Sequence, residues 1–435
     1  AFIIAVDSAL KALTREDIDF HIGISVDPRK NPELFKEERI RQYPIVLTAN
    51  SIPTIAKEKK AVFFGFGARS QCYANYLFLN ENNFEVAAVA EPKEHLRRLA
   101  EEKYHCSRER LYPGWREMLD DGVQGDLLFI CTQDNEHVEP AIAAIQAGYR
   151  QIMVEKPIYK DIEKCRQLAA AAREYGAVVQ VCHSLRYNNF YRKVKEILDS
   201  GKIGQIASIN HMEPVGTFHY AHSFVRGDWN KTADSPMILA KCCHDTDLLL
   251  WLTGRDCLSL SSYGSLEFFK RENAPEGCAD RCIDGCKYSG SCPYSATKYL
   301  GKYKDHLFRE YAVEKEGYTD TVEALKKGRY GRCVFQCDND VVDHQTVNLL
   351  FEDGITATLT MCAFSNFERE THIMGTMGEI RAYMKDDLAE VYNFRSGDRE
   401  IYHVGHPDAL HGGADTVLVE DFIASALGDK PPATR

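Results

Sequence analysis

The sequence predicts two domains in series: an α/β domain with a doubly wound parallel sheet, then an α+β domain with an open, mainly antiparallel sheet. Between residues 58 and 182, continuous apolar runs alternate with segments of helical spacing. After residue 183, apolar and polar residues alternate along most of the predicted strands. Continuous apolar strands indicate a parallel sheet covered on both faces, whereas alternation indicates a sheet with one solvated face.

The first domain is predicted over residues 58–182. Its predicted strands are 59–67, 84–92, 125–132, 150–157 and 177–184, with helices between them at 70–80, 92–104, 135–148 and 161–176. Gly148 and Gly176 end the last two helices, a position where glycine is common. Residues 1–57 carry no motif and stay unassigned.

The second domain is predicted over residues 183–435. Helices are expected at 186–204 and 235–254, and strands at 206–215, 258–266, 344–365, 369–376 and 379–384. The run FEDGI lies between two alternating segments and predicts a hairpin turn. A cysteine-rich insertion at about 272–300 interrupts this pattern.

The composition is that of an ordinary globular protein and excludes some partners. The chain has 435 residues, of which 44% are hydrophobic and 27% charged, and its net charge is −11. This acidic balance argues against nucleic acid and anionic membrane surfaces as partners. No apolar run approaches the roughly 20 residues of a membrane span. Several of the 15 cysteines stand singly in apolar segments, so we expect reduced thiols and a cytoplasmic protein.

A glycine motif follows the first predicted strand. It consists of Gly65, Phe66, Gly67, Ala68, Arg69 and Ser70. Gly65 permits a tight turn, and Gly67 lets backbone N–H groups approach a pyrophosphate at the helix N-terminus. Glu91 closes the next strand, where it could bind a ribose diol. The motif predicts a dinucleotide-binding site, and the alternative is an ordinary glycine turn without a ligand. Glu91 favours NAD as the dinucleotide, while the basic residues that follow it leave NADP open.

Two further motifs carry candidate proton-transfer groups. The run VEKP places Glu155 and Lys156 at the carboxyl end of a predicted parallel strand, where open sheets bind ligands. A lysine beside a cationic nicotinamide could exchange protons near neutral pH. Lys241, His244 and Asp247 are spaced three apart on a predicted helix and share one face. The alternatives are a surface lysine and a solvated helix face.

The order of these motifs resembles the glucose–fructose oxidoreductase/inositol dehydrogenase/rhizopine-catabolism (Gfo/Idh/MocA) family. The similarity covers roughly residues 58–430 and rests on the glycine motif, Glu91, CTQDNEH, VEKP, RYNNFY…SGKIG and KCCHDTDLLLWLTG. It implies an NAD(P)-binding Rossmann domain and a second domain whose open sheet forms the interface of a homodimer or homotetramer. It further implies oxidation of a secondary ring hydroxyl of a small-molecule sugar or cyclitol.

The resemblance also implies roles for single residues. Lys156 and His244 would be catalytic, helped by Lys241 or Asp245, because Ala240 stands where many members have an Asp. The residues implied to line the cofactor are Thr132, Gln133, His137, Glu155 and Lys156. Members usually continue into one more helix, so a chain that stops at KPPATR is expected to be truncated.

A polar aromatic loop at 216–230 precedes the His244 helix. Hydroxyl-pairing groups and an aromatic ring for the apolar sugar face are typical of sugar sites. The candidate substrate contacts are Tyr187, His219, His222, Arg226, Trp229 and Asp245. A surface loop in which Trp229 merely packs is the alternative.

Four cysteines of the insertion could bind a structural zinc ion. They are Cys278, Cys282, Cys286 and Cys292, with spacings of three, three and five residues. Free thiols in a scaffold insertion are the alternative, and an iron–sulfur cluster is less favoured.

The sequence thus predicts an NAD(P)-dependent dehydrogenase that transfers a hydride from a sugar, glycoside or cyclitol to nicotinamide, with Lys156 and His244 moving the proton. Two other functions stay open. One is a glycoside-cleaving enzyme with tightly bound, internally recycled NAD. The other is a non-catalytic NAD-sensing regulatory protein, against which the retained lysine and histidine count.

Overall fold

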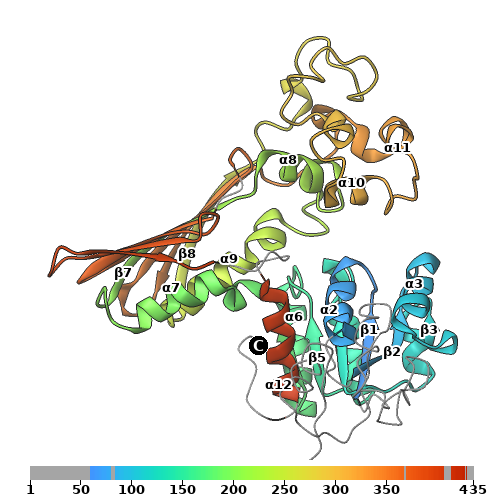
Figure 1. Cartoon of the computed structure of the whole chain (residues 1–435), viewed down its shortest axis with the longest axis horizontal. Helices are drawn as coiled ribbons and strands as arrows, with labels where there is room; N and C mark the ends of the chain where they lie inside the picture. Colours follow the sequence, from blue (N-terminus) through green and yellow to red (C-terminus); the bar gives the residue numbers. More distant parts are fainter. Residues whose placement is uncertain (1–58, 80–83, 367–368, 406–412, 427, 429–435) are drawn as a thin grey trace, which may run out of the picture.

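The computed structural model describes residues 59–79, 84–366, 369–405, 413–426 and 428. The chain folds into two domains that follow one another in the sequence (Figure 1). The first has a six-stranded sheet in the order β3-β2-β1-β4-β5-β6, and the second an eight-stranded sheet in the order β14-β13-β12-β11-β7-β10-β9-β8. The predicted fold class is confirmed. The unassigned segment 1–57 and the expected truncation at KPPATR concern residues outside the described ranges.

The first domain is a doubly wound parallel sheet. Its strands are β1 (Lys59–Phe64), β2 (Phe84–Ala90), β3 (Leu111–Tyr112), β4 (Leu127–Ile130), β5 (Gln151–Val154) and β6 (Val178–Val181), all paired in parallel. The helices are α2 (Ala68–Leu79), α3 (Glu94–Tyr104), α4 (Trp115–Asp120), α5 (Val138–Gln146) and α6 (Ile162–Tyr175). Phe63 packs into the core on one face and Phe64 into the core on the other, which explains the continuous apolar runs.

The strand order reverses between β1 and β4, and this brings two loops together. Phe64 ends β1 directly opposite Ile130, which ends β4. The glycine turn at 65–67 and the residues from Cys131 onward therefore leave the sheet as neighbours. Open parallel sheets bind ligands at such a point.

The second domain packs helices on one face of a mostly antiparallel sheet. Its strands are β7 (Ile206–Pro214), β8 (Cys257–Ser265), β9 (His344–Phe351), β10 (Thr356–Cys362), β11 (Glu370–Gly375), β12 (Gly378–Tyr383), β13 (Leu388–Asn393) and β14 (Arg399–His403). The helices are α7 (Asn189–Asp199), α8 (Thr217–Tyr220), the π-helix Ala221–Arg226 and α9 (Met237–Thr253). Only β7 and β10 pair in parallel, and β9 and β10 form the predicted FEDGI hairpin.

A long connection separates two neighbouring strands of this sheet. Strands β8 and β9 pair antiparallel, yet residues 266–343 lie between them. This β8–β9 segment contains α10 (Leu307–Ala312) and α11 (Thr321–Lys327) and packs around its own apolar cluster, which includes Phe218 of α8. The segment and α8 lie together beyond one end of the sheet (Figure 1).

The last helix returns to the first domain. Helix α12 (Ala414–Ala426) buries Leu418, Val419 and Phe422 in the core under the parallel sheet, where Phe422 meets the ring of Phe129 edge-on at 5.5 Å. Tyr187, at the domain junction, donates a 2.7 Å hydrogen bond to Asp421 of the same helix. No helix was predicted in this part of the sequence.

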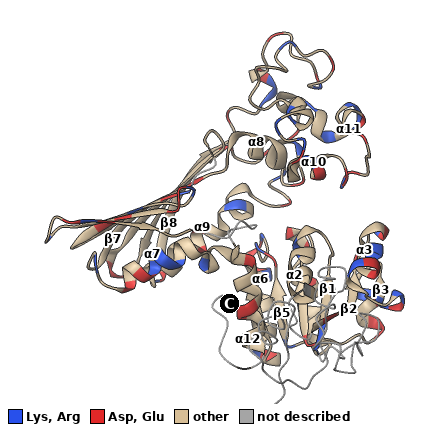
Figure 2. Cartoon of the chain, viewed as in Figure 1, with Lys and Arg blue, Asp and Glu red and all other residues tan. Residues whose placement is uncertain are grey.

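Charged residues of both signs are interspersed over the two domains (Figure 2), in keeping with the acidic but mixed composition. Among the helices of the described residues, none has the length and apolar character that a bilayer crossing requires.

Candidate functional site

One cavity of about 790 Å³ gathers most of the predicted site residues. From the first domain it is lined by Gly67, Ala68, Arg69, Thr132, Gln133, His137, Glu155 and Lys156. From the second it is lined by Trp229, Lys241 and His244, and by Tyr311, Lys315 and Tyr330 of the β8–β9 segment. The structure therefore brings the predicted cofactor motif and the predicted catalytic residues to one place.

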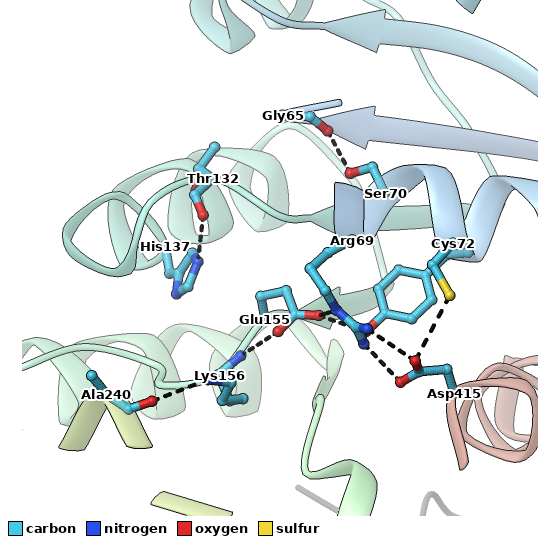
Figure 3. A network of polar contacts seen from close by, with 11 residues as sticks. Gly65, Arg69, Ser70, Cys72, Thr132, His137, Glu155, Lys156, Ala240 and Asp415 are labelled. Carbon is cyan, nitrogen blue, oxygen red and sulfur yellow. Dashed lines mark hydrogen bonds and ion pairs between the residues drawn. The ribbon is translucent and has the colours of Figure 1, made fainter. Parts of the chain in front are cut away.

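The glycine turn packs closely against the backbone of Cys131 at Gly65 and has open space beside it at Gly67. Gly65 has a φ of +79°, and a Cβ there would lie 2.6 Å from the carbonyl oxygen of Cys131. A Cβ on Gly67 would meet no atom within 4 Å. Ser70 closes the turn with a 2.6 Å hydrogen bond from its hydroxyl to the Gly65 carbonyl (Figure 3). The open N-terminus of α2 thus fits the pyrophosphate of a dinucleotide.

Glu91 is held beside this turn by backbone hydrogen bonds. Its carboxylate accepts from the N–H of Phe66 at 2.7 Å and from the N–H of Lys93 at 3.0 Å. Glu91 and the ring of Phe66 are buried and do not line the cavity, whereas Lys93 does. A carboxylate has about four acceptor sites, so Glu91 retains capacity for ribose hydroxyls.

Glu155 belongs to a buried network that fixes its position. Arg69 donates to Glu155 at 2.9 Å and reaches Asp415 of α12 at 2.8 Å, while the Tyr73 hydroxyl donates to Glu155 at 2.5 Å (Figure 3). Burial alone would raise the pKa of Glu155, but the charge of Arg69 and the Tyr73 hydrogen bond outweigh it and the pKa is lowered. Glu155 is therefore an ionised anchor. Sequence reasoning missed Tyr73 and Asp415.

Lys156 connects the two domains. It follows β5, precedes a cis peptide bond to Pro157, and donates a 3.1 Å hydrogen bond from Nζ to the carbonyl oxygen of Ala240 on α9 (Figure 3). This contact places the lysine next to the helix turn that carries Lys241 and His244. His137 lies nearby, with its ring nitrogens 2.8 Å from the Pro157 carbonyl oxygen and 3.1 Å from that of Thr132.

The three residues predicted to share one helix face have different partners. Lys241 forms an ion pair with buried Glu213 at 3.3 Å. The ring of His244 lies 5.9 Å from that of His183, whose pKa is lowered by burial. Asp247 is bound by Arg186 through two contacts, at 2.6 and 2.7 Å. Asp247 is therefore occupied by that pair and lies outside the cavity lining.

Asp245, predicted as a substrate contact, lies outside the cavity lining. It is fully buried and lies 2.8 Å from His211 and 2.7 Å from Arg369. Burial would raise its pKa, but the charge of Arg369 and the His211 hydrogen bond lower it. Arg369 also pairs with Glu213 at 2.6 Å and lines the cavity, a role that the sequence analysis did not predict. These residues form a buried charged layer beneath Lys241.

Two further predicted substrate residues, Tyr187 and His222, are buried outside the cavity lining. Tyr187 is buried and hydrogen-bonded to α12. His222 is buried, lies 2.6 Å from the Tyr299 hydroxyl and stacks on Tyr330 at 4.7 Å. Burial lowers the pKa of His222 to about 3. Neither residue lines the cavity, because each is held by groups that the sequence pattern could not pair with it.

Of the remaining predicted loop residues, His219 and Arg226 pack inside the protein and Trp229 lines the cavity. His219 packs beside Phe308 with 5.4 Å between ring centroids, and burial lowers its pKa well below the usual range. It is absent from the cavity lining, as is Arg226, which is fully buried. Trp229 does line the cavity, and its indole N–H donates to Asp134 at 3.1 Å.

The predicted zinc site is not supported. Cys278, Cys282, Cys286 and Cys292 line a second cavity of about 260 Å³ together with Arg226. Across the described part of the chain, no three His, Cys, Asp or Glu side chains are arranged as ligands of one metal ion. The thiols are free, and burial raises the pKa of Cys292. Arg226 donates instead to the carbonyl oxygens of Arg332 at 2.7 Å and Tyr294 at 2.8 Å.

Sequence profiles identify both domains. The profile of the oxidoreductase family with an NAD-binding Rossmann fold matches residues 59–183, and that of its C-terminal alpha/beta domain matches residues 195–434. The chain belongs to the Gfo/Idh/MocA family. As a member of this family it is an oxidoreductase, and its first domain is an NAD-binding Rossmann domain.

Individual relatives agree with this assignment. The Bacillus subtilis protein YteT, whose name assigns it to the oxidoreductases, is 23% identical over 70% of this chain and 73% of its own length. The inositol 2-dehydrogenase of Pseudomonas fluorescens is 30% identical over 34% of this chain and 41% of its own length. The scyllo-inositol dehydrogenase of Lactobacillus casei, solved with NAD(H) and scyllo-inositol, shares the fold with a TM-score of 0.58 at 18% identity, covering 86% of this chain and 91% of that one.

Proposed function

We propose that this Gfo/Idh/MocA protein oxidises a secondary ring hydroxyl of a sugar, glycoside or cyclitol, with NAD as the hydride acceptor. The observation that carries the proposal is the 3.1 Å hydrogen bond between Lys156 Nζ and the Ala240 carbonyl. It holds the lysine at the end of β5 against the helix of Lys241 and His244, in the cavity that the glycine turn also lines. The named inositol dehydrogenases among the relatives support a polyol substrate.

The residues present fit a nicotinamide dinucleotide. Gly67 and the first turn of α2 would hold the pyrophosphate, Glu91 the ribose diol, and Thr132 and Gln133 would line the bound cofactor. The cofactor supplies the hydride-accepting carbon. A buried carboxylate at Glu91 disfavours a 2′-phosphate by charge repulsion, so we expect NAD to be preferred over NADP.

The chain's own residues handle the proton. Lys156 would accept the proton of the reacting hydroxyl, because its Nζ is the amine held at the strand end within the cavity. His244 would relay or share that proton from α9. Lys241 would orient a neighbouring hydroxyl, its ammonium being fixed by Glu213. Trp229 would offer a ring face to the apolar side of the sugar.

Substitution of Lys156 tests this assignment. We expect NADH formation, followed by absorbance with myo-inositol, scyllo-inositol, D-glucose, D-galacturonate and disaccharides built from glucose or galacturonate, to occur in the wild type. In Lys156→Ala, kcat should fall by a factor of about 10² to 10⁴, the usual contribution of general acid–base catalysis. NAD affinity, measured by calorimetry, should change little.

Lys160→Ala is the matched control. Lys160 lies four residues later, is exposed, and also donates to a backbone carbonyl, that of Ala233. Its replacement should leave kcat within about twofold of wild type, the scatter usual for surface substitutions. Full activity of Lys156→Ala would disprove the catalytic role, and absence of NAD binding by the wild type would disprove the function as a whole.

A further inference from the structure

The β8–β9 segment (residues 266–343) supplies one wall of the main cavity. Tyr311, Lys315, Glu316, Arg329 and Tyr330 line the cavity from this segment, in addition to the cofactor turn and α9. Neighbouring antiparallel strands can be joined by a turn of two to five residues. A folded connection that instead reaches the active-site cavity is a candidate for substrate selection.

The wall is firmly attached to the rest of the domain. Arg329 is bound by Asp228, outside the segment, at 2.6 Å, and by Glu316, within the segment, at 2.8 Å. Arg226, fully buried in the neighbouring π-helix, donates to the carbonyl oxygens of Arg332 and Tyr294 on the same segment. Side chains on this wall are therefore presented by a fixed scaffold, as a binding site requires.

Each charged side chain of the wall has an ion-pair partner among the described residues except that of Lys315. The positive charge of Arg329 is met by two carboxylates, and Glu314 is paired with Arg309 at 3.0 Å. Within the described residues, Lys315 forms no ion pair, and its Nζ lies 3.5 Å from the ring centroid of Tyr311. The aromatic ring holds the ammonium by a cation–π contact but does not neutralise it. An ammonium that is held at a cavity wall without an ion-pair partner is suited to an anionic group.

We propose that Lys315, supported by Tyr311, forms a subsite for an anionic substituent of the substrate. The substituent is a carboxylate or a phosphate ester on a glycoside that extends beyond the ring being oxidised. The inference rests on the proposed function, since it assigns the substrate class of the same cavity. A neutral cyclitol would fill the reacting position and leave the ammonium of Lys315 without a counter-charge.

Matched substrates test the subsite. The wild type would be assayed for NADH formation with cellobiose as the neutral disaccharide, cellobiouronic acid as its carboxylate derivative, and cellobiose 6′-phosphate as its phosphate ester. We expect kcat/KM for one anionic substrate to exceed that for cellobiose by about tenfold or more, the value of one charge-assisted hydrogen bond. The preferred anion distinguishes a carboxylate site from a phosphate site.

Two lysine variants separate the subsite from general effects. In Lys315→Met, kcat/KM for the preferred anion should fall about tenfold through KM, while that for cellobiose or a monocyclic polyol stays within about twofold. Lys302→Met is the control, because Lys302 also lies over an aromatic ring, Tyr303 at 5.3 Å, but is not in the cavity lining. It should change neither value.

The two proposals fail in different ways. Equal losses for neutral and anionic substrates in Lys315→Met, or a wild type that prefers neutral or monocyclic polyols, would overturn the subsite and leave the dehydrogenase assignment standing. Absence of turnover with every substrate named for both assays would overturn the dehydrogenase assignment, and the subsite with it.

Discussion

Glu155 and Lys156 are neighbours at one strand end, but their surroundings give them opposite tasks. Glu155 is bonded by Arg69 and Tyr73, and its pKa is lowered, so its charge is locked in a structural network. Lys156 has one hydrogen bond to a neutral carbonyl and lines the cavity. Glu155 is therefore held by partners inside the protein, whereas the Lys156 side chain reaches the cavity that a substrate would enter. The distinction depends on partners from α2 and α9, and the VEKP motif by itself does not reveal it.

His222 gives a pH-dependent prediction. Burial lowers its pKa to about 3, whereas an unfolded histidine titrates near 6.5. Between these values the unfolded chain binds a proton that the folded chain does not. The contribution of His222 to the free energy of unfolding is therefore fully present above about pH 6.5. It decreases by about 1.4 kcal/mol per pH unit as the pH falls toward 3. Denaturant unfolding from pH 8 to pH 4.5 measures the loss.

The variant His222→Gln should flatten this dependence. At pH 8 it should be less stable by about 1–2 kcal/mol, because the ring stack on Tyr330 and the Tyr299 contact are weakened. The difference from wild type should shrink or reverse by pH 5. His403→Gln, at an exposed position on β14, should leave the pH slope unchanged. Parallel curves for wild type and His222→Gln would contradict the assignment.

Residue type alone did not distinguish side chains that face the cavity from side chains that pair with other groups inside the protein. Tyr187, His222, Arg226 and Asp245 were predicted as sugar contacts because their side chains can pair with hydroxyls. In the structure, those same groups pair with Asp421, Tyr299, Arg332 and Arg369. A polar side chain satisfied inside the protein has the same sequence signature as one that faces a ligand. The partners come from segments tens to hundreds of residues away, so local patterns could not identify them.

At the scale of elements, the strands and helices of the first domain were predictable because each carries a local period. The glycine turn after β1 and the lysine after β5 could be placed at strand ends for the same reason. Helix α12 and the fold of the β8–β9 segment could not be predicted in this way, because their positions depend on packing against distant partners such as Phe129 and Phe218. One available signal for α12 was the run ADTVLVEDF, in which apolar residues recur at helical spacing.

Helix α12 should support the cofactor site through Asp415. In Asp415→Asn, Arg69 loses one of its two charged partners, which should lower the free energy of unfolding by about 1–3 kcal/mol. Because Arg69 also holds Glu155, KM for NAD should rise several-fold, and kcat should change less. Thermal unfolding and steady-state kinetics measure the two effects.

Glu420→Gln is the matched control on the same helix. Glu420 accepts an exposed 2.9 Å hydrogen bond from Tyr76 of α2, so it joins the same two helices away from the cavity. Its replacement should cost less than about 1 kcal/mol, as exposed polar contacts usually do, and should leave KM for NAD unchanged. Equal changes in KM for both variants would show that α12 acts by docking alone.

At the scale of the whole molecule, three separate parts of the chain meet at one cavity. The parallel sheet provides the glycine turn and Lys156, α9 provides His244, and the β8–β9 segment provides Tyr311 and Lys315. The first two could be predicted from motifs, because a phosphate turn and a proton donor need particular residues in a particular order. The third part forms the wall to which we assign substrate selection. Many different sequences can form such a wall, so no sequence motif predicted it.

The eight-stranded sheet has one uncovered face, and we expect a second copy of the chain to bind there. Helices α7 and α9 lie along one face, while none of the described helices covers the other (Figure 1). Near its centre Asn210, Thr358 and Asn348 stand in register on β7, β10 and β9, and Tyr263 on β8 is 77% exposed. The small uncharged side chains on β7, β9 and β10 leave this part of the face inexpensive to desolvate, whereas the same row continues into His372 and Arg381 on β11 and β12.

A charge at the centre of this face should separate the copies. Light scattering after size exclusion should give the wild type the mass of at least two chains and Thr358→Arg the mass of one, because an arginine there would meet its symmetry mate across an isologous interface. Ile162→Arg, at a 66% exposed position on α6, should keep the wild-type mass. Since the cavity is built within one chain, the Thr358→Arg monomer should retain NAD binding; loss of that binding would mean that the partner copy shapes the cofactor site.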